Sequence, residues 1–318
     1  MLRFAVSRLL QMLLSMWVAL TLLFVAVTQL PGDPVRALFG FKPPPPEIYS
    51  RIREQFHLGE SVPSQYLAYV GSLLRGDLGN SYPLDPYGNA TVGASVSDTL
   101  AAVVPVSAVL LAASLLVQAL VGVVAGSLAA RKRTRLSRSL YALALLLVSA
   151  PVLLAAFTLR TVFGTGLGWL PVRGLAAGPQ AYVLPVLALS ALSTGYVMLL
   201  TRSEVRETLA APYIAAARGR GLSPAVVLSR HALRPSLIPV AAFLAANAGQ
   251  LFVGLIVVEG IFGIPGLGGA IFDSINNRDR SLLIGLVTVV MAVVIMANAA
   301  ADLLIAALDP RVRQAQRV

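Results

Sequence analysis

The dominant pattern along the chain is a succession of long apolar runs separated by short polar segments. A helix needs about 20 apolar residues to cross the hydrocarbon core of a bilayer, and several runs have about this length. Helices satisfy their backbone polar groups within one segment, as a membrane requires. The pattern therefore predicts an all-α polytopic membrane protein with six transmembrane helices. The predicted spans are residues 9–30, 106–130, 140–159, 182–200, 237–258 and 282–307.

The first apolar run can also be compared with a secretory signal peptide. It is longer than the usual apolar core of such a signal, and no small-residue cleavage site precedes Pro31. We therefore expect an uncleaved first span, with the short basic segment 1–8 in the cytoplasm.

Prolines and one arginine are expected to shape the spans. Pro105 should separate an amphipathic lead-in from the second span, and Pro151 should bend the third, because proline removes a helical hydrogen bond. Arg160 lies near the outer end of the third span, where a long cationic side chain can snorkel to the interface. Pro235 and Pro239 are expected to mark the re-entry of the chain into the membrane at the fifth span.

Residues 31–99 interrupt the apolar pattern with prolines, turn residues and more acids than bases. Within them, residues 47–56 and 63–74 have apolar positions at helical spacing. We expect a small extracytoplasmic helical cap, which is either scaffold or a docking platform for an extracytoplasmic binding protein. The predicted organisation is an N-terminal transmembrane helix (1–30), this cap (31–99) and a five-helix core (100–318).

A strongly basic loop, residues 202–236, lies between the fourth and fifth spans. Short loops rich in arginine stay in the cytoplasm. Pro212 and three alanines favour a short helix that Gly219 and Gly221 end, and Ser223 with Pro224 favours a second helix through Leu233. The loop is expected to form a helix–turn–helix at the membrane surface; an ordinary cytoplasmic loop of good helix formers is the alternative. Its charged residues are Arg202, Glu204, Arg206, Glu207, Arg218, Arg220, Arg230 and Arg234.

Composition agrees with a membrane protein: 57% of the residues are hydrophobic, 12% are charged, and the net charge is +11. The basic residues are divided among short loops expected inside, which favours contact with anionic lipid headgroups and argues against a nucleic-acid-binding face. The chain is expected in the inner or plasma membrane of the cell. Because the number of spans is even, both termini are expected in the cytoplasm.

Catalytic and cofactor chemistry is not expected in this chain. It has no cysteine and two histidines, which argues against thiolate chemistry and a histidine metal cluster. Neither of its lysines, Lys42 and Lys132, belongs to a Gly-Lys-Ser/Thr phosphate-binding loop. Energy for uphill transport would have to come from a partner or from an ion gradient.

Polar residues inside the spans are candidates for a translocation path, because such residues are costly in a membrane. Hydrogen bonding between helices is the alternative role. Asn247 and Gln250 are three residues apart and are expected to share a helix face. Thr194 and Glu259 are further candidates, whereas Asp302 could instead pair with a loop arginine.

The loop motif resembles a known family. Ala215-Ala216-Ala217 followed by Arg218 and Gly221 is similar to the "EAA…G" motif of binding-protein-dependent ABC transport permeases. The run from Tyr213 onward, and segments 31–34, 76–82, 259–279 and 302–311, resemble its dipeptide/oligopeptide/nickel branch. Ala215 stands where the general motif has an acidic residue. The resemblance implies a type I ABC importer permease fold whose coupling helix contacts an ATPase through Tyr213, Ala215, Ala216, Ala217, Arg218, Gly221 and Leu222.

The same resemblance implies partners and a substrate. The partners are a second permease subunit, two cytoplasmic ATPases that bind ATP and Mg²⁺, and an extracytoplasmic substrate-binding protein. The implied substrate is a short peptide, with nickel or another small solute as the alternative. From the residues alone, a secondary transporter or channel and a membrane-embedded scaffold also stay open.

Overall fold

The computed structural model describes residues 2–29, 32–33, 35–36, 39, 43–82, 93–131 and 134–308, and these form helices almost throughout. The expected all-α class is confirmed. The chain divides into two compact units, one of Met1–Ser107 with Pro265–Ile295 and one of Ala108–Ile264 with Met296–Val318. The predicted division at residues 30 and 99 stays a prediction, since these units group the chain by contact rather than by sequence.

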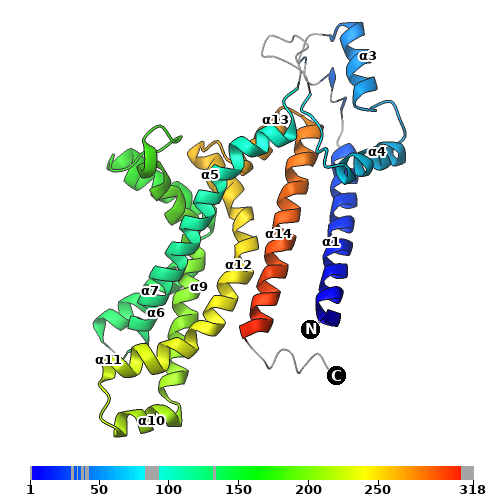
Figure 1. Cartoon of the computed structure of the whole chain (residues 1–318). Coiled ribbons are helices and arrows are strands. Elements are labelled where there is room, and N and C mark those ends of the chain that lie inside the picture. The colour runs from blue at the N-terminus through cyan, green and yellow to red at the C-terminus, as the bar shows by residue number, and fades with distance from the viewer. Residues whose placement is uncertain are drawn as a thin grey trace. The chain divides into compact units, whose positions relative to one another are not determined.

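The first unit contains α1 (Leu2–Thr28), the start of α5 (Val96–Val117), α13 (Leu267–Asn276) and most of α14 (Arg280–Leu308). It also contains the two short helices of the predicted cap, α3 (Pro46–Gln55) and α4 (Val62–Leu74). Each cap helix has a proline in its first turn. Proline is favoured there because an N–H group at this position would have no intrahelical partner. Figure 1 shows α4 at the end of α1.

An aromatic cluster and a small hydrophobic core hold the cap helices in place. Phe24 of α1 packs edge-on against Tyr66 at 5.4 Å and stacks on Tyr69 at 5.7 Å, which fixes α4 on α1. Around α3, a small core forms from Val35, Ile52 and Tyr82. The cap thus has a hydrophobic core of its own despite its polar sequence.

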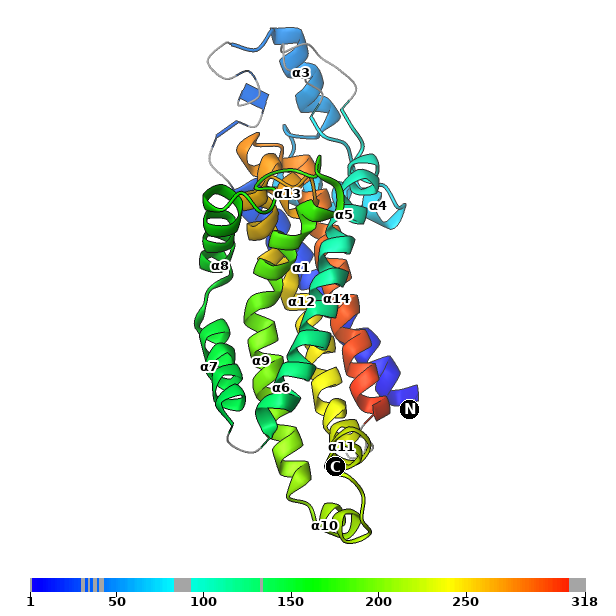
Figure 2. The same ribbon diagram turned by 90° about the vertical axis from the view of Figure 1, so that its left-hand side faces the viewer.

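The second unit is built around one central helix, α9 (Val183–Leu209). Figure 2 shows α9 beside the neighbouring helices of this unit. Most residues of its apolar part are buried, whereas the other candidate spans are largely exposed. The helices packed against it are α6 (Val123–Ala130), α7 (Arg135–Ser149), α8 (Val152–Leu159) and α12 (Leu233–Phe262).

Two glycines let backbones approach α9 closely. A Cβ atom on Gly126 of α6 would lie 2.7 Å from the carbonyl oxygen of Met198, and one on Gly195 of α9 would lie 2.8 Å from that of Ala144 in α7. Small residues at such crossings are how membrane helices gain close packing, because lipid provides no hydrophobic drive for association. α9 is therefore fixed by backbone contacts on two sides.

The number of spans agrees with the prediction once a broken helix is counted. Five helices are long and apolar enough to cross a membrane, and the pair Arg135–Ser149 and Val152–Gly166 makes a sixth if it is one span. This pair is bent by 109° at the break. The expected bend at Pro151 is confirmed.

Other expected breaks do not occur. Helix continues through Pro105 from Val96 to Ala130, and through Pro235 and Pro239 from Pro224 to Phe262. The expectations that Pro105 separates a lead-in, and that the second loop helix ends at Leu233, were therefore wrong. Long membrane helices tolerate proline because neighbouring groups and local π-helical turns accommodate the freed carbonyls. The π-helical turn Val227–Ala232 contains His231, whose carbonyl is the one that Pro235 leaves without a donor.

Replacing Gly126 by alanine tests the close approach of α6 to α9. The added methyl group would collide with the backbone of α9, so we expect a loss of about 1–3 kcal/mol in the free energy of unfolding. The measurement is thermal or denaturant unfolding of the purified chain in detergent. Gly260→Ala is the matched control, because nothing lies within 4 Å of its added Cβ. Equal stability of the two variants would contradict the packing argument.

Candidate functional site

The basic loop after α9 folds into the predicted short helix. α10 (Pro212–Gly219) starts at Pro212 and ends at Gly219, as the sequence indicates. Figure 2 shows it at the end of α9. Ile214 and Ala217 are buried and form a small core with Val227. These contacts fix α10 against the chain that follows it.

The residues expected to contact an ATPase separate into two groups. Ala217 faces the small core of the loop and is buried. The other residues are exposed and form the accessible side of the loop, which we call the outer face of α10. This face consists of Tyr213, Ala215, Ala216, Arg218, Gly221 and Leu222.

Gly221 has a conformational role in this turn. Its φ is +82°, and an added Cβ would meet nothing within 4 Å. L-residues with side chains disfavour this left-handed region, whereas glycine adopts it readily. The N–H of Gly221 donates to the carbonyl of Arg218 at 2.9 Å. Backbone conformation, rather than lack of space, thus accounts for glycine at the end of α10.

The chain after α10 begins with the predicted cap and then continues directly into a long helix. The backbone N–H of Val226 donates to the Ser223 hydroxyl at 3.5 Å. The helix runs from α11 (Pro224–Val226) through a π-helical turn into α12.

Pro235 has no N–H for the carbonyl of His231, and the Tyr213 hydroxyl donates to this carbonyl at 3.4 Å. Tyr213 of the outer face is thereby bonded to the π-helical turn that leads into α12.

Arg202, one of the loop arginines, packs inside this unit near the end of α9. Its Nε donates to the carbonyl of Ala129 at 3.3 Å, and its guanidinium carbon lies 4.1 Å from the centre of the Tyr141 ring. Ser137 also donates to Ala129, at 3.0 Å. A cation at the last turn of α6 is stabilised by the helix dipole. Sequence reasoning read Arg202 only as a topology signal, because its partners are distant in sequence.

Inside the second unit, the path candidate Asn247 meets two other polar residues of the spans. The Asn247 Nδ2 atom donates to Gln118 Oε1 and to Ser193 Oγ, both at 3.0 Å. All three residues are buried. The bonds join α12, the π-helical turn at Gln118 and α9, which is the interhelical role that polar residues often have in membranes.

The remaining path candidates lie in different surroundings. Gln250 is exposed although it is three residues from Asn247, so the two do not share an environment. Thr194 is buried, and among the described residues nothing bonds to its hydroxyl. Glu259 is fully buried in the last turn of α12. The side chain of Asp302 lies outside the described part of the chain.

The last carbonyl groups of α12 accept hydrogen bonds from two residues of the segment between α8 and α9. The guanidinium of Arg160 donates to the carbonyl of Ile261 at 2.8 Å. The N–H of Gly174 donates to the carbonyl of Phe262 at 2.9 Å. The guanidinium of Arg160 thus satisfies a helix carbonyl that has no intrahelical donor. Its expected position at the membrane interface stays a prediction.

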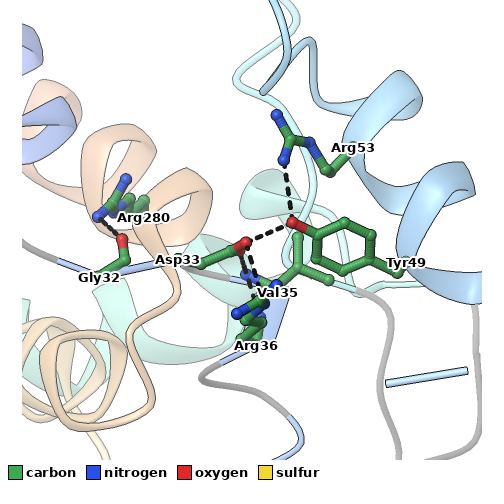
Figure 3. Close-up of polar contacts among 7 residues, drawn as sticks. All are labelled: Gly32, Asp33, Val35, Arg36, Tyr49, Arg53 and Arg280. Carbon is green, nitrogen blue, oxygen red and sulfur yellow. Dashed lines mark hydrogen bonds and ion pairs between the residues drawn. The ribbon is translucent and has the colours of Figure 1, made fainter. Parts of the chain in front are cut away.

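A polar network organises the predicted cap around Asp33 (Figure 3). The hydroxyl of Tyr49 donates to Asp33 Oδ2 at 2.5 Å and accepts from Arg53 Nη1 at 2.9 Å. Partial burial raises the pKa of Asp33, but the hydrogen bonds from Tyr49 and from the backbone of Arg36 and Val35 outweigh it and hold the pKa below the usual value. Asp33 is thus a carboxylate at neutral pH.

A second carboxylate, Asp279, joins the cap to the start of α14. It accepts from the hydroxyl of Ser81 and from the backbone N–H groups of Tyr82 and Leu282. Burial is the main effect on its pKa, which is raised above the usual value despite these bonds. The residues flanking this contact, 76–82 and 279, belong to the segments that resemble the permease branch.

The geometry defines a helical, membrane-spanning chain with a short exposed helix at the end of its central span. Comparison with known proteins identifies its family. The model of the family described as binding-protein-dependent transport system inner membrane component matches residues 122–314, and that of the N-terminal region of these components matches residues 1–110. The chain belongs to this family and is a multi-pass component of the inner membrane.

Relatives match along the full chain. The chain is 33% identical to the oligopeptide transport system permease protein OppB of Haemophilus influenzae and 34% identical to that of Salmonella typhimurium. It is 33% identical to the corresponding protein of Escherichia coli K12. Each match covers 98% of this chain and 100% of the relative.

Proposed function

We propose that the chain is one permease subunit of an ATP-driven importer for short peptides. The observation that carries this proposal is the full-length similarity to oligopeptide transport permeases, which covers 98% of the chain. The exposed Ala215, Ala216 and Gly221 on the outer face of α10 support it, because small residues let a partner's backbone approach closely. Peptide rather than nickel is proposed because the matched relatives are oligopeptide permeases.

In the proposed assembly, this chain pairs with a second, homologous permease, and two cytoplasmic ATPases bind ATP and Mg²⁺. A substrate-binding protein delivers peptide to the outer side. The chain itself performs no hydrolysis and has both termini in the cytoplasm. ATP-driven closure of the ATPases moves α10 as a rigid body. The hydrogen bond of Tyr213 to His231 and the packing of Ile214 with Val227, both in the π-helical turn that leads into α12, support this transmission.

The proposed path lies between the two permeases. Gln250 is exposed on α12 and is available to such a path. Asn247 supports the path from within, since its amide is bonded to Gln118 and Ser193. Thr194 and Glu259 are buried in this chain and would reach solute only after the helices move.

Reconstitution tests the function. The complete complex in proteoliposomes is expected to accumulate a labelled tripeptide only when ATP and the binding protein are both present. Energy coupling then comes from the partners, as the proposal requires. Uptake by this chain alone without ATP would contradict the proposal and favour a secondary transporter, and uptake of nickel but not of peptide would overturn the assigned substrate.

A pair of glycine variants tests the role of α10. Gly221→Ala places a side chain at a positive φ, which costs about 1 kcal/mol and disturbs the turn. We expect less peptide transported per ATP hydrolysed, with unchanged membrane insertion. Gly219→Ala is the control, because it adds the same methyl group two residues earlier, where nothing lies within 4 Å and φ is ordinary. The same transport-to-hydrolysis ratio in both variants would argue against the conformational role.

A further inference from the structure

The cap helices, together with the ends of α1 and α14, line an open pocket that the proposed function does not use. Its volume is about 600 Å³, within the range of roughly 300–1,000 Å³ typical of small-molecule sites. Its walls come from the ends of α1 and α3, from α4, from segment 77–82 and from the start of α14. All of these belong to the first compact unit.

The pocket carries charges of both signs. Arg53, Arg75 and Arg280 line it together with Asp33 and Asp77. Arg280 donates to the carbonyl of Gly32 at 2.9 Å, and Figure 3 shows Asp33 between Arg280 and Arg53. Guanidinium and carboxylate groups in one pocket suit a ligand that itself has a negative and a positive end.

Two of these groups keep unused bonding capacity. In the part of the chain that the structure describes, the guanidinium of Arg75 donates only to the Ser72 hydroxyl, at 3.4 Å, and forms no ion pair. Asp77 accepts the N–H of Gly79 on Oδ1 at 2.9 Å, and no described residue donates to its Oδ2. A guanidinium that lacks a carboxylate partner binds an external carboxylate well, often through two parallel hydrogen bonds.

Part of the remaining wall is aromatic. Phe24, Phe56, Tyr69 and Tyr82 line it. Phe24 and Tyr69 stack, and the Tyr69 hydroxyl is already bonded to Thr288 at 2.7 Å. Fixed aromatic rings provide contact area for apolar side chains of a ligand.

We propose that this pocket binds a short peptide with free ends, whose α-carboxylate pairs with Arg75 and whose α-ammonium pairs with Asp77. The pocket would hold peptide at the outer side of the membrane. This inference rests on the proposed function, because it assumes that peptides are the solute. A phospholipid phosphate fits less well, since Asp33 and Asp77 would repel it, and an internal loop of a partner protein lacks the two charged ends.

Peptides with blocked ends give the sharpest test. The probe is the tripeptide Ala-Phe-Ala, compared with its C-terminal amide and its N-acetyl form, and binding is measured by calorimetry on the full chain in lipid nanodiscs. We expect each blocked form to bind at least about fivefold more weakly than the free peptide, as loss of one charge-assisted contact implies.

Two variants assign the ends of the peptide. Arg75→Gln should weaken binding of the free peptide about fivefold and remove the difference between free and amidated peptide. Asp77→Asn keeps an acceptor for Gly79 and should remove the difference between free and N-acetylated peptide. Arg51→Gln is the matched control, because Arg51 is an exposed arginine of α3 that does not line the pocket; its affinities should equal those of the wild type.

Several results would overturn the inference. Equal binding of the free, amidated and N-acetylated peptides would show that the free ends are not recognised, as expected of a site for a partner's loop. A phospholipid that co-purifies with the wild type but not with Arg75→Gln, without any peptide binding, would indicate a lipid site. If the complete complex imports peptide while the lone chain binds none at the cap, this inference fails and the proposed function stands; absence of peptide import by the complex would refute the proposed function itself.

Discussion

The structure depends on how closely α9 is approached by its neighbours. Gly126 and Gly195 bring two other helices to within backbone contact of α9. Between lipid-solvated helices, van der Waals packing and interhelical hydrogen bonds are the main sources of stability. A central helix packed in this way moves with its neighbours rather than bending alone. Arg202 extends the same packing to the end of α9, through its bond to Ala129 and its contact with Tyr141.

This packing gives the exposed helix α10 a mechanical connection to the spans. α9 ends at Leu209, and α10 begins at Pro212. At the base of α12, the hydroxyls of Thr208 and Ser236 are 3.2 Å apart, and Tyr213 bonds to the carbonyl that Pro235 leaves without a donor. A force on α10 would therefore reach both α9 and α12, as the proposed coupling requires. These are two of the three elements joined by the Asn247, Ser193 and Gln118 cluster.

Much of this could be predicted from the sequence, because apolar length and turn chemistry are local signals. The spans, the bend at Pro151 and the limits of α10 follow from such signals. The continuous helices through Pro105 and Pro239 could not be predicted, since proline tolerance depends on what surrounds the freed carbonyl. The different environments of Asn247 and Gln250 were missed because the partners of Asn247 lie on other helices. The cap pocket, likewise, arises from segments that are distant in sequence.

The central claim is that the outer face of α10 docks on an ATPase, and a crosslinking experiment tests it most directly. The chain has no cysteine, so single cysteines can be introduced at Ala216, which is exposed, and at Ala217, which is buried against Val227. In the assembled complex, a short thiol-directed photocrosslinker on Ala216→Cys should form an adduct with the ATPase subunit, and Ala217→Cys should form little or none. Absence of any ATPase adduct from Ala216→Cys in an active complex would contradict the account.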